Sequence, residues 1–223
     1  MPLYTVERIT IEVVSAIACF ILLRFMIKPF QLTGETRYLG LPLGFGFLGI
    51  SYAFSALSFS PIFDFTNKGL VQLFLRAFAF LFLAVTYYFS KSAKDRKLLW
   101  NATLAVLAAV LTIFIMVAII DPEILWLDYH QAQVYVRIFN LICLAYISIH
   151  ALKSHIEKPE PTTLMIPLGY ILLGINQYSL LIWAVDSSIF AFFAGLTLRL
   201  AGLAVFLFVS YWTFYSSGEK GDK

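Results

Sequence analysis

The chain has 223 residues, of which 61% are hydrophobic and only 13% are charged, and its formal net charge at pH 7 is +3. Its mean hydropathy is +0.84. This composition excludes a soluble domain, because one small core could not bury so many apolar side chains. The two cysteines, Cys19 and Cys143, both lie inside apolar segments, so a disulfide framework is not expected.

Seven apolar segments follow one another along the chain, each long enough or nearly long enough to cross about 30 Å of hydrocarbon. We place them at residues 9–27, 38–59, 69–89, 98–120, 134–152, 163–185 and 189–214. Little chain is left between them. We therefore expect one all-α domain over residues 1–215, a seven-helix transmembrane bundle, followed by a short cytoplasmic tail at 216–223. The first segment carries Arg8 and Glu12 and has no small-residue cleavage site, which indicates a retained helix and not a signal peptide.

Basic residues outside these segments gather on one side of the predicted bundle. The connections after the first, third and fifth segments, together with the tail, hold Lys28, Arg37, Lys91, Lys94, Arg96, Lys97, Lys153, Lys158, Lys220 and Lys223. The opposite side has only Arg8 and Lys68, and its loop at 121–128 is acidic. Because cytoplasmic loops carry the excess of lysine and arginine, we predict a multi-pass protein of the cytoplasmic membrane with its N-terminus outside and its C-terminus inside.

Two proline-containing segments resemble each other. Residues 42–50 (PLGFGFLGI) and 167–175 (PLGYILLGI) share six of nine aligned positions. In the segments that follow, Arg76 and Tyr88 are twelve residues apart, as are Arg199 and Tyr211. This pattern predicts a parallel repeat in a 3+1+3 plan, in which the fourth segment connects the two halves. Parallel repeats suit a site at the repeat interface. The same plan also resembles that of rhodopsin-like seven-helix proteins, so it does not by itself indicate transport.

Three arginines interrupt the apolar segments at intervals of 61 and 62 residues: Arg76, Arg137 and Arg199. A guanidinium at membrane depth costs about 2.5–3.5 kcal/mol on insertion scales, so charged residues there almost always face the bundle interior. Counting at about 1.5 Å per residue from the cytoplasmic charges places polar groups of all seven segments at one level, in the outer half of the bilayer. The candidate binding residues at this level are Glu12, Tyr52, Arg76, Arg137, Asn140, Asn176, Gln177 and Arg199, and Thr112 represents the fourth segment.

This polar layer has two interpretations. Three arginines against the buried Glu12 leave it net positive by about two charges, part of which Asp186 would neutralise. It would then form an outward-facing pocket for a carboxylate, phosphate or other anionic group, which arginine forks bind well. Alternatively, ion pairs and amide hydrogen bonds tie the helices together, and Arg137 snorkels to the outer interface.

Several kinds of chemistry lack the residues they need. No lysine lies inside a segment, so a retinal Schiff base is excluded. The three histidines, His130, His150 and His155, do not supply a facing pair for haem or a ligand set for zinc. No pair of intramembrane aspartates exists, and no nucleophilic Ser or Cys has a histidine at matching depth. We therefore expect no enzyme activity, no cofactor and no nucleic-acid partner; the bilayer is the expected environment.

Three functions agree with these features. The first is a receptor or sensor that binds a small anionic or polar ligand and signals through a cytoplasmic or membrane protein partner; in topology it resembles the seven-helix sensing modules of prokaryotic kinases. The second is a small-solute transporter, which resembles the SWEET-type and PQ-loop transporters in plan but lacks their Pro-Gln signature. The third is a non-catalytic subunit of a larger membrane complex. We favour the first function.

Overall fold

The computed structural model describes residues 5–59, 67–89, 97–120, 128–157, 159 and 161–213. These residues form helices and their connections, with no strand among them. In chain order the elements are α1 (Thr5–Met26), α2 (Lys28–Thr33), the 3₁₀ helix η1 (Thr36–Leu39), α3 (Gly40–Leu57), α4 (Lys68–Phe89), α5 (Lys97–Ile120), α6 (Tyr129–Glu157), α7 (Pro161–Asp186) and α8 (Ile189–Tyr211). Seven spans in this part of the chain are long and apolar enough to cross a membrane, as the sequence predicts.

Two helices extend at least four residues beyond the apolar segments that predicted them. Helix α1 begins at Thr5 and not at residue 9, and α6 runs from Tyr129 to Glu157, beyond both ends of 134–152. A hydropathy pattern detects only the part of a helix that lies in hydrocarbon, whereas the helix itself continues into the interface. Arg8, which we expected outside the first span, is consequently part of α1. The predicted tail and nearly all of the acidic loop lie outside the described residues.

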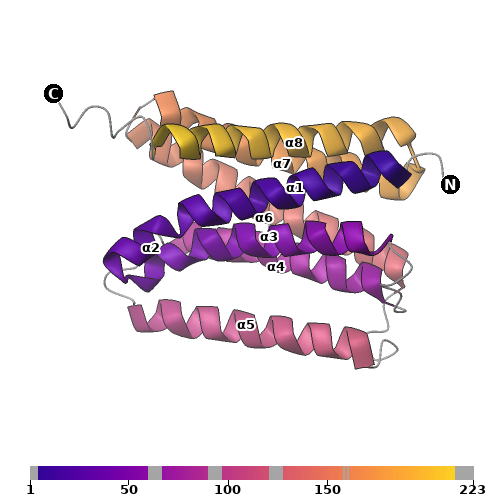
Figure 1. The fold of residues 1–223 in the computed structure, drawn as a ribbon, viewed down its shortest axis with the longest axis horizontal. Helices are drawn as coiled ribbons and strands as arrows, with labels where there is room; N and C mark the ends of the chain where they lie inside the picture. Colours follow the sequence, from indigo (N-terminus) through magenta and orange to yellow (C-terminus); the bar gives the residue numbers. More distant parts are fainter. Residues whose placement is uncertain are drawn as a thin grey trace.

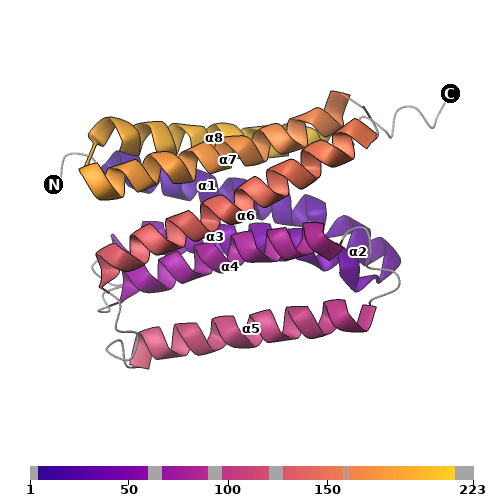
Figure 2. The same ribbon diagram turned by 180° about the vertical axis from the view of Figure 1, so that it is seen from behind.

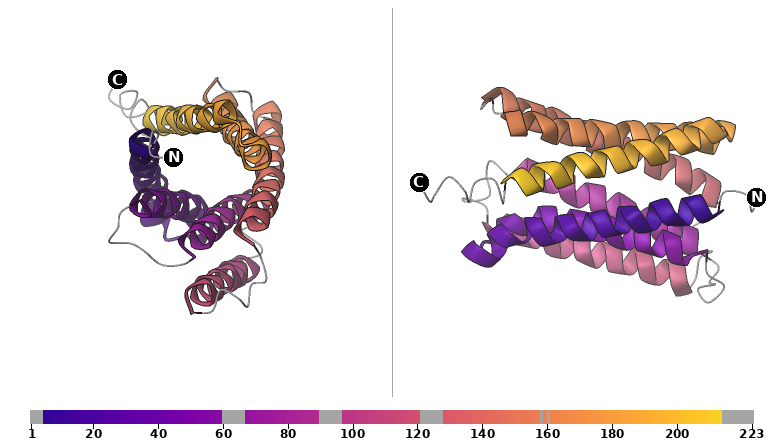
Figure 3. Two further views of the ribbon diagram at one scale, coloured as in Figure 1. Left: turned by 90° about the vertical axis from the view of Figure 1, so that its right-hand side faces the viewer. Right: turned by 45° about the horizontal axis from the view of Figure 1, so that its top comes forward.

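Six of the helices form a ring in the order α1, α3, α4, α6, α7 and α8, and α8 closes the ring by packing on α1 (Figure 3). They run along the long axis of the molecule (Figures 1 and 2). Within the ring α3 lies between α1 and α4, and α7 lies between α6 and α8. The sequence supplies apolar residues around most of each helix. It does not indicate which helices become neighbours.

Helix α5 lies outside the ring and packs on α4 (Figure 3). Trp100 donates from Nε1 to the carbonyl oxygen of Thr36 at 2.9 Å, and Asn67 donates from Nδ2 to the carbonyl oxygen of Ala118 at 3.1 Å. No charged residue occurs between Leu98 and Ile119. Such a helix can face lipid over most of its surface, because this stretch carries no charge that requires a polar partner.

An apolar core fills the half of the ring that lies away from the N-terminus. All six ring helices contribute to it, through residues that include Cys19, Leu22, Phe45, Leu48, Leu83, Ile147, Tyr170, Leu173, Leu203 and Phe206. Phe206 of α8 meets Phe45 of α3 edge to face at 5.4 Å and Tyr170 of α7 at 4.7 Å, measured between ring centroids. Side chains from all six ring helices therefore meet in one apolar cluster in this half of the ring.

Helices α7 and α8 approach each other closely at Gly202. A Cβ atom at Gly202 would lie 3.1 Å from the carbonyl oxygen of Gly169 and 3.3 Å from the Leu173 side chain. The carbonyl oxygen belongs to a packed helix and cannot move independently. At Gly174, by contrast, the nearest atom to a new Cβ would be that of Leu144, at 4.0 Å.

These two glycines give a matched pair of substitutions. We expect Gly202→Ala to lower the free energy of unfolding by about 1–3 kcal/mol, because the new methyl group overpacks the contact between α7 and α8. Gly174→Ala should be neutral or should stabilise by up to about 1 kcal/mol, because it meets no obstacle and alanine favours the helix. Thermal unfolding of both variants in one detergent measures the difference. Equal losses at the two positions would contradict the close approach of α7 and α8.

Candidate functional site

A small polar cavity lies in the other half of the ring, near the end at which α1, α4, α6 and α8 begin. Its volume is about 30 Å³, and it is lined by Arg8, Glu12, Gln72, Leu73, Arg76, Tyr129, Gln133, Arg137, Leu180, Trp183, Phe192, Leu196 and Arg199. We call its four guanidinium-bearing residues, Arg8, Arg76, Arg137 and Arg199, the arginine cluster. Each comes from a different helix of the ring, so the cluster exists only when the ring is assembled.

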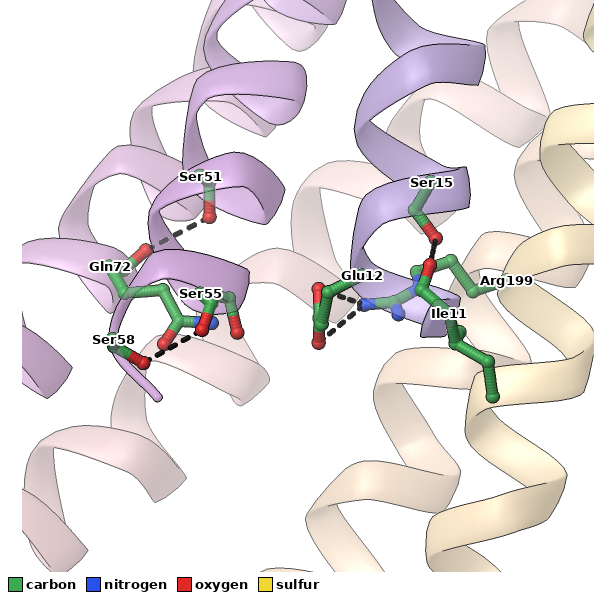
Figure 4. Close-up of polar contacts among 8 residues, drawn as sticks. All are labelled: Ile11, Glu12, Ser15, Ser51, Ser55, Ser58, Gln72 and Arg199. Atoms are coloured by element: carbon green, nitrogen blue, oxygen red, sulfur yellow. Dashed lines mark hydrogen bonds and ion pairs between the residues drawn. The ribbon is translucent and has the colours of Figure 1, made fainter. Parts of the chain in front are cut away.

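Arg199 of α8 forms an ion pair with Glu12 of α1 (Figure 4). Its Nη1 atom lies 3.1 Å from Oε2 and 3.2 Å from Oε1 of the carboxylate. Only 1% of Arg199 and 3% of Glu12 is exposed. A buried pair of this kind joins α8 to α1, where the chain closes the ring.

Tyr52 of α3 connects two members of the cluster. The Cζ atom of Arg199 lies 4.4 Å from the centroid of the Tyr52 ring, and that of Arg76 lies 4.9 Å from it. Tyr52 is fully buried. A cation close to an aromatic face is attracted by the ring quadrupole, and the attraction is larger when both groups are desolvated. Tyr52 does not itself line the cavity; it packs beside the arginines that do.

Arg76 and Arg137 carry charges that no carboxylate neutralises within the described part of the chain. Each is 95% buried. The Nε and Nη2 atoms of Arg76 and the Nε atom of Arg137 have no hydrogen-bond partner there. Arg137 also lies close enough to Arg76 and Arg8 for their charges to repel one another. Arg137 therefore does not snorkel to the interface, as one interpretation of the sequence expected; it faces the interior of the ring.

The cluster carries more positive charge than the sequence predicted. Four guanidiniums and the Glu12 carboxylate line the cavity, which leaves three formal positive charges where we expected two. The difference is Arg8, whose guanidinium also stacks 4.9 Å from the ring of Phe59 and 5.6 Å from that of Phe192. A signal for Arg8 was present in the sequence, since residues four apart lie on one face of a helix and Arg8 precedes Glu12 by four.

The amide residues of the predicted layer, Asn140, Asn176 and Gln177, lie outside the cavity. Asn140 follows Arg137 by three residues on α6, and its Nδ2 donates to Oε1 of Gln177 on α7 at 3.4 Å. Asn176, next to Gln177, is completely buried, and neither atom of its amide has a partner among the described residues. These three amides do not line the cavity. Asn140 and Gln177 thus form a second polar contact, in which Asn140 lies about one helical turn beyond Arg137 along α6.

Two predictions about the layer are wrong. Thr112 does not join it, because α5 lies outside the ring; its side chain is exposed and bonds the carbonyl oxygen of Ala108. Depth counting finds the level of a residue and not the side of the bundle on which its helix lies. Asp186 is exposed at the end of α7 and does not line the cavity, so it does not neutralise the cluster. The sequence also did not indicate Gln72, Tyr129, Gln133 and Trp183 as lining residues.

Over the described residues, the fold and the cavity define a membrane protein with seven helices that are long and apolar enough to span a bilayer, six of them in a ring that encloses an arginine cluster. Among the described residues, no group of three or more His, Cys, Asp or Glu side chains is arranged to hold a metal ion. No family model, curated protein or solved structure matches this chain. The function is therefore inferred from the site itself.

Proposed function

We propose that this protein is a receptor or sensor that binds a small anion at the arginine cluster. The observation that carries the proposal is the charge of the cavity, where four guanidiniums from four helices meet one carboxylate. Holding uncompensated like charges together in a membrane costs several kcal/mol, and a bound anion would offset that cost. A purely structural role would need enough acceptors to satisfy the arginines, and Glu12 is the carboxylate that the described residues provide.

The hydrogen-bonding groups support an anionic ligand over a neutral one. The cluster has unpartnered N–H donors on all four arginines: Arg8 Nε, Arg76 Nε and Nη2, Arg137 Nε, and Arg199 Nε and Nη2. The buried side-chain amides outside the cavity contribute only two unpartnered acceptor oxygens, on Asn140 and Asn176. A ligand that complements this site must chiefly accept hydrogen bonds. Oxyanions do so, and arginine binds them through charge-assisted pairs.

The proposed orientation places the site on the outer side of the cytoplasmic membrane. The distribution of lysine and arginine outside the spans supports an external N-terminus. The cavity lies at the end of the bundle where α1 begins, so in this orientation an external ligand would reach it without crossing the membrane. A signal would then pass to a protein partner on the cytoplasmic side, where the basic connections lie.

Sensing is preferred over transport because of the apolar core. In the proposed orientation, the apolar core to which Phe206, Phe45 and Tyr170 belong would lie between the cavity and the cytoplasmic end. A ligand at the arginine cluster would therefore have no polar route onward in this conformation. Its binding energy could instead shift the packing between the helices that carry the four arginines.

One observation favours a small-solute transporter as the second candidate. The order of the ring divides into α1–α3–α4 and α6–α7–α8, and the similar proline-glycine segments lie on the middle helices, α3 and α7. This arrangement agrees with the parallel 3+1+3 repeat proposed from the sequence, with α5 as the connector outside the ring. Transporters built from such repeats bind their substrate between the halves, and the arginine cluster draws on both halves.

A thermal-shift measurement on the purified full-length protein tests anion binding. Sulfate, phosphate, nitrate, acetate and chloride are titrated at constant pH and ionic strength, first with wild type and then with Arg137→Gln. Arg137 suits this purpose because it makes no ion pair within the described residues, so its removal should disturb the fold least. We expect at least one anion to raise the wild-type Tm, and Arg137→Gln to weaken its binding about tenfold or more, the value of one charge-assisted hydrogen bond.

The control is Arg24→Gln, which removes the same charge from an exposed position at the far end of α1. This variant should respond to anions as wild type does. A binding site at the cluster would be rejected if no anion raises the Tm of wild type. It would also be rejected if Arg137→Gln and Arg24→Gln weaken the anion-dependent rise in Tm equally. For the anion that binds, saturable uptake into proteoliposomes would favour the transporter, and binding without uptake would favour the sensor.

A further inference from the structure

We infer that the ligand of the arginine cluster is a small, free, doubly charged tetrahedral oxyanion of the sulfate or phosphate kind. This inference rests on the proposed anion-binding function and narrows its ligand. It depends on three quantitative features of the site: the number of charges, the edge of each guanidinium that is unpartnered, and the size of the cavity.

The number of charges favours an anion with two negative charges. The cavity holds three formal positive charges after Glu12 is counted. A singly charged anion would leave two of them uncompensated in an environment that screens charge poorly. A doubly charged anion leaves one, and that remaining charge can be placed on Arg8, which is partly exposed and stacks on two aromatic rings.

The unpartnered atoms of two arginines form complete binding edges. Glu12 engages Arg199 only through Nη1, and this leaves the side edge, Nε with Nη2, without a partner. The same edge of Arg76 is also unpartnered. Each such edge presents two parallel N–H groups that match two oxygens of an oxyanion. The two arginine edges and Arg137 together offer more donors than the oxygens of a carboxylate or nitrate, which all lie in one plane, can accept. A tetrahedral oxyanion has four oxygens that point in different directions.

The size of the cavity excludes large ligands. The cavity has a volume of about 30 Å³. A cavity needs about 10–15 Å³ to hold one water molecule. The space therefore admits two or three water-sized groups, which suits a compact inorganic oxyanion. A sugar phosphate or a nucleotide would not fit without separating the helices.

Glu12 has a positioning role in this arrangement. Its carboxylate fixes Nη1 of Arg199 and so orients the opposite edge of the same guanidinium. It also reduces the positive charge of the cavity by one, which limits how tightly any anion binds. The site is consequently suited to reversible binding and not to permanent occupancy.

The test compares anions by charge and shape under the thermal-shift conditions described above. We expect the apparent Kd of sulfate to lie about tenfold or more below that of nitrate, acetate and chloride, because one further charge-assisted hydrogen bond alone is worth about that factor. Glycerol phosphate is the size control and should bind more weakly than phosphate. Nanodiscs of phosphatidylcholine with and without phosphatidic acid identify the source, and phosphatidic acid should not replace the effect of the free anion.

Arg76→Lys separates geometry from charge. Lysine keeps the positive charge but cannot present a planar fork. We expect this variant to lose about tenfold in sulfate affinity while its affinity for chloride changes little. Arg24→Lys, the same change at an exposed site, should leave both affinities unchanged. If Arg76→Lys does not fold, the wild-type comparison of anions decides the question by itself.

Three results would overturn the inference. One is binding of nitrate, acetate or chloride as tight as that of sulfate, which would leave the anion site standing but remove its selectivity. Another is binding of glycerol phosphate as tight as that of phosphate. The third is stabilisation by phosphatidic acid alone, which would assign the site to a lipid head group. If no anion stabilises the protein, the proposed function itself fails.

Discussion

Glu12→Gln is expected to lower the free energy of unfolding by about 3–5 kcal/mol, the usual cost of removing one partner from a buried ion pair. The substitution keeps the shape of the side chain but removes its charge. Arg199, which is 1% exposed, would then remain buried without a carboxylate and beside three other arginines. Thermal unfolding, or unfolding by a denaturing detergent, of the purified protein in the absence of added anions measures the loss.

A double substitution tests whether the pair itself causes this loss. Glu12→Leu with Arg199→Met replaces both charges by apolar side chains, and such exchanges are often close to neutral. We expect the double variant to be more stable than Glu12→Gln. A second readout is anion binding, which Glu12→Gln should strengthen because the cavity gains one positive charge. A stable Glu12→Gln variant with unchanged anion affinity would show that the ion pair has neither role.

Tyr52→Leu should produce the second large effect, a loss of about 2–4 kcal/mol in the free energy of unfolding. The substitution removes the aromatic ring that two guanidiniums contact at 4.4 and 4.9 Å. It also leaves a void in a fully buried position. Both arginines would then lose a cation–π contact in a site with few acceptors, so sulfate binding should weaken as the arginines lose their fixed orientation.

Tyr52→Phe is the matched control. It keeps the ring and removes only the hydroxyl, which has no hydrogen-bond partner among the described residues. We expect the free energy of unfolding to change by less than about 1 kcal/mol, because the substitution breaks no hydrogen bond. A loss as large as that of Tyr52→Leu would mean that the hydroxyl, and not the ring, supports the arginine cluster.

The sequence predicted which residues belong to the site better than it predicted the contacts between them. Glu12, Arg76, Arg137 and Arg199 line one cavity, and depth counting placed them at one level. Tyr52 was also placed there, although its role, contact with two guanidiniums through its ring, was not foreseen. Arg8 was missed because it lies outside the apolar run, although its spacing from Glu12 placed both on one face of α1.

The position of α5 was not foreseen either. All seven segments are long enough to span a bilayer, and the depth of Thr112 matched that of the arginines. The absence of charged residues between Leu98 and Ile119 was the available signal. A helix without charged groups needs no place in the ring, because lipid solvates its side chains as well as other helices do.

By itself, the sequence determined that the chain forms seven membrane-spanning helices with buried charges. In hydrocarbon each helix must satisfy its own backbone hydrogen bonds, so about 20 apolar residues are sufficient to specify a span. Charged residues far from the ends of those spans turn inward because hydrocarbon does not solvate a charge, whereas those near a helix end, such as Arg24, can stay exposed. Both conclusions depend on local composition alone.

Only the tertiary structure decided which arginine receives the carboxylate and which remain unneutralised. Glu12 and Arg199 are 187 residues apart, and they meet because α8 closes the ring on α1. The order of helices in the ring and the rotation of each about its axis set such contacts. Packing between helices fixes both, and no periodicity within a single helix specifies them.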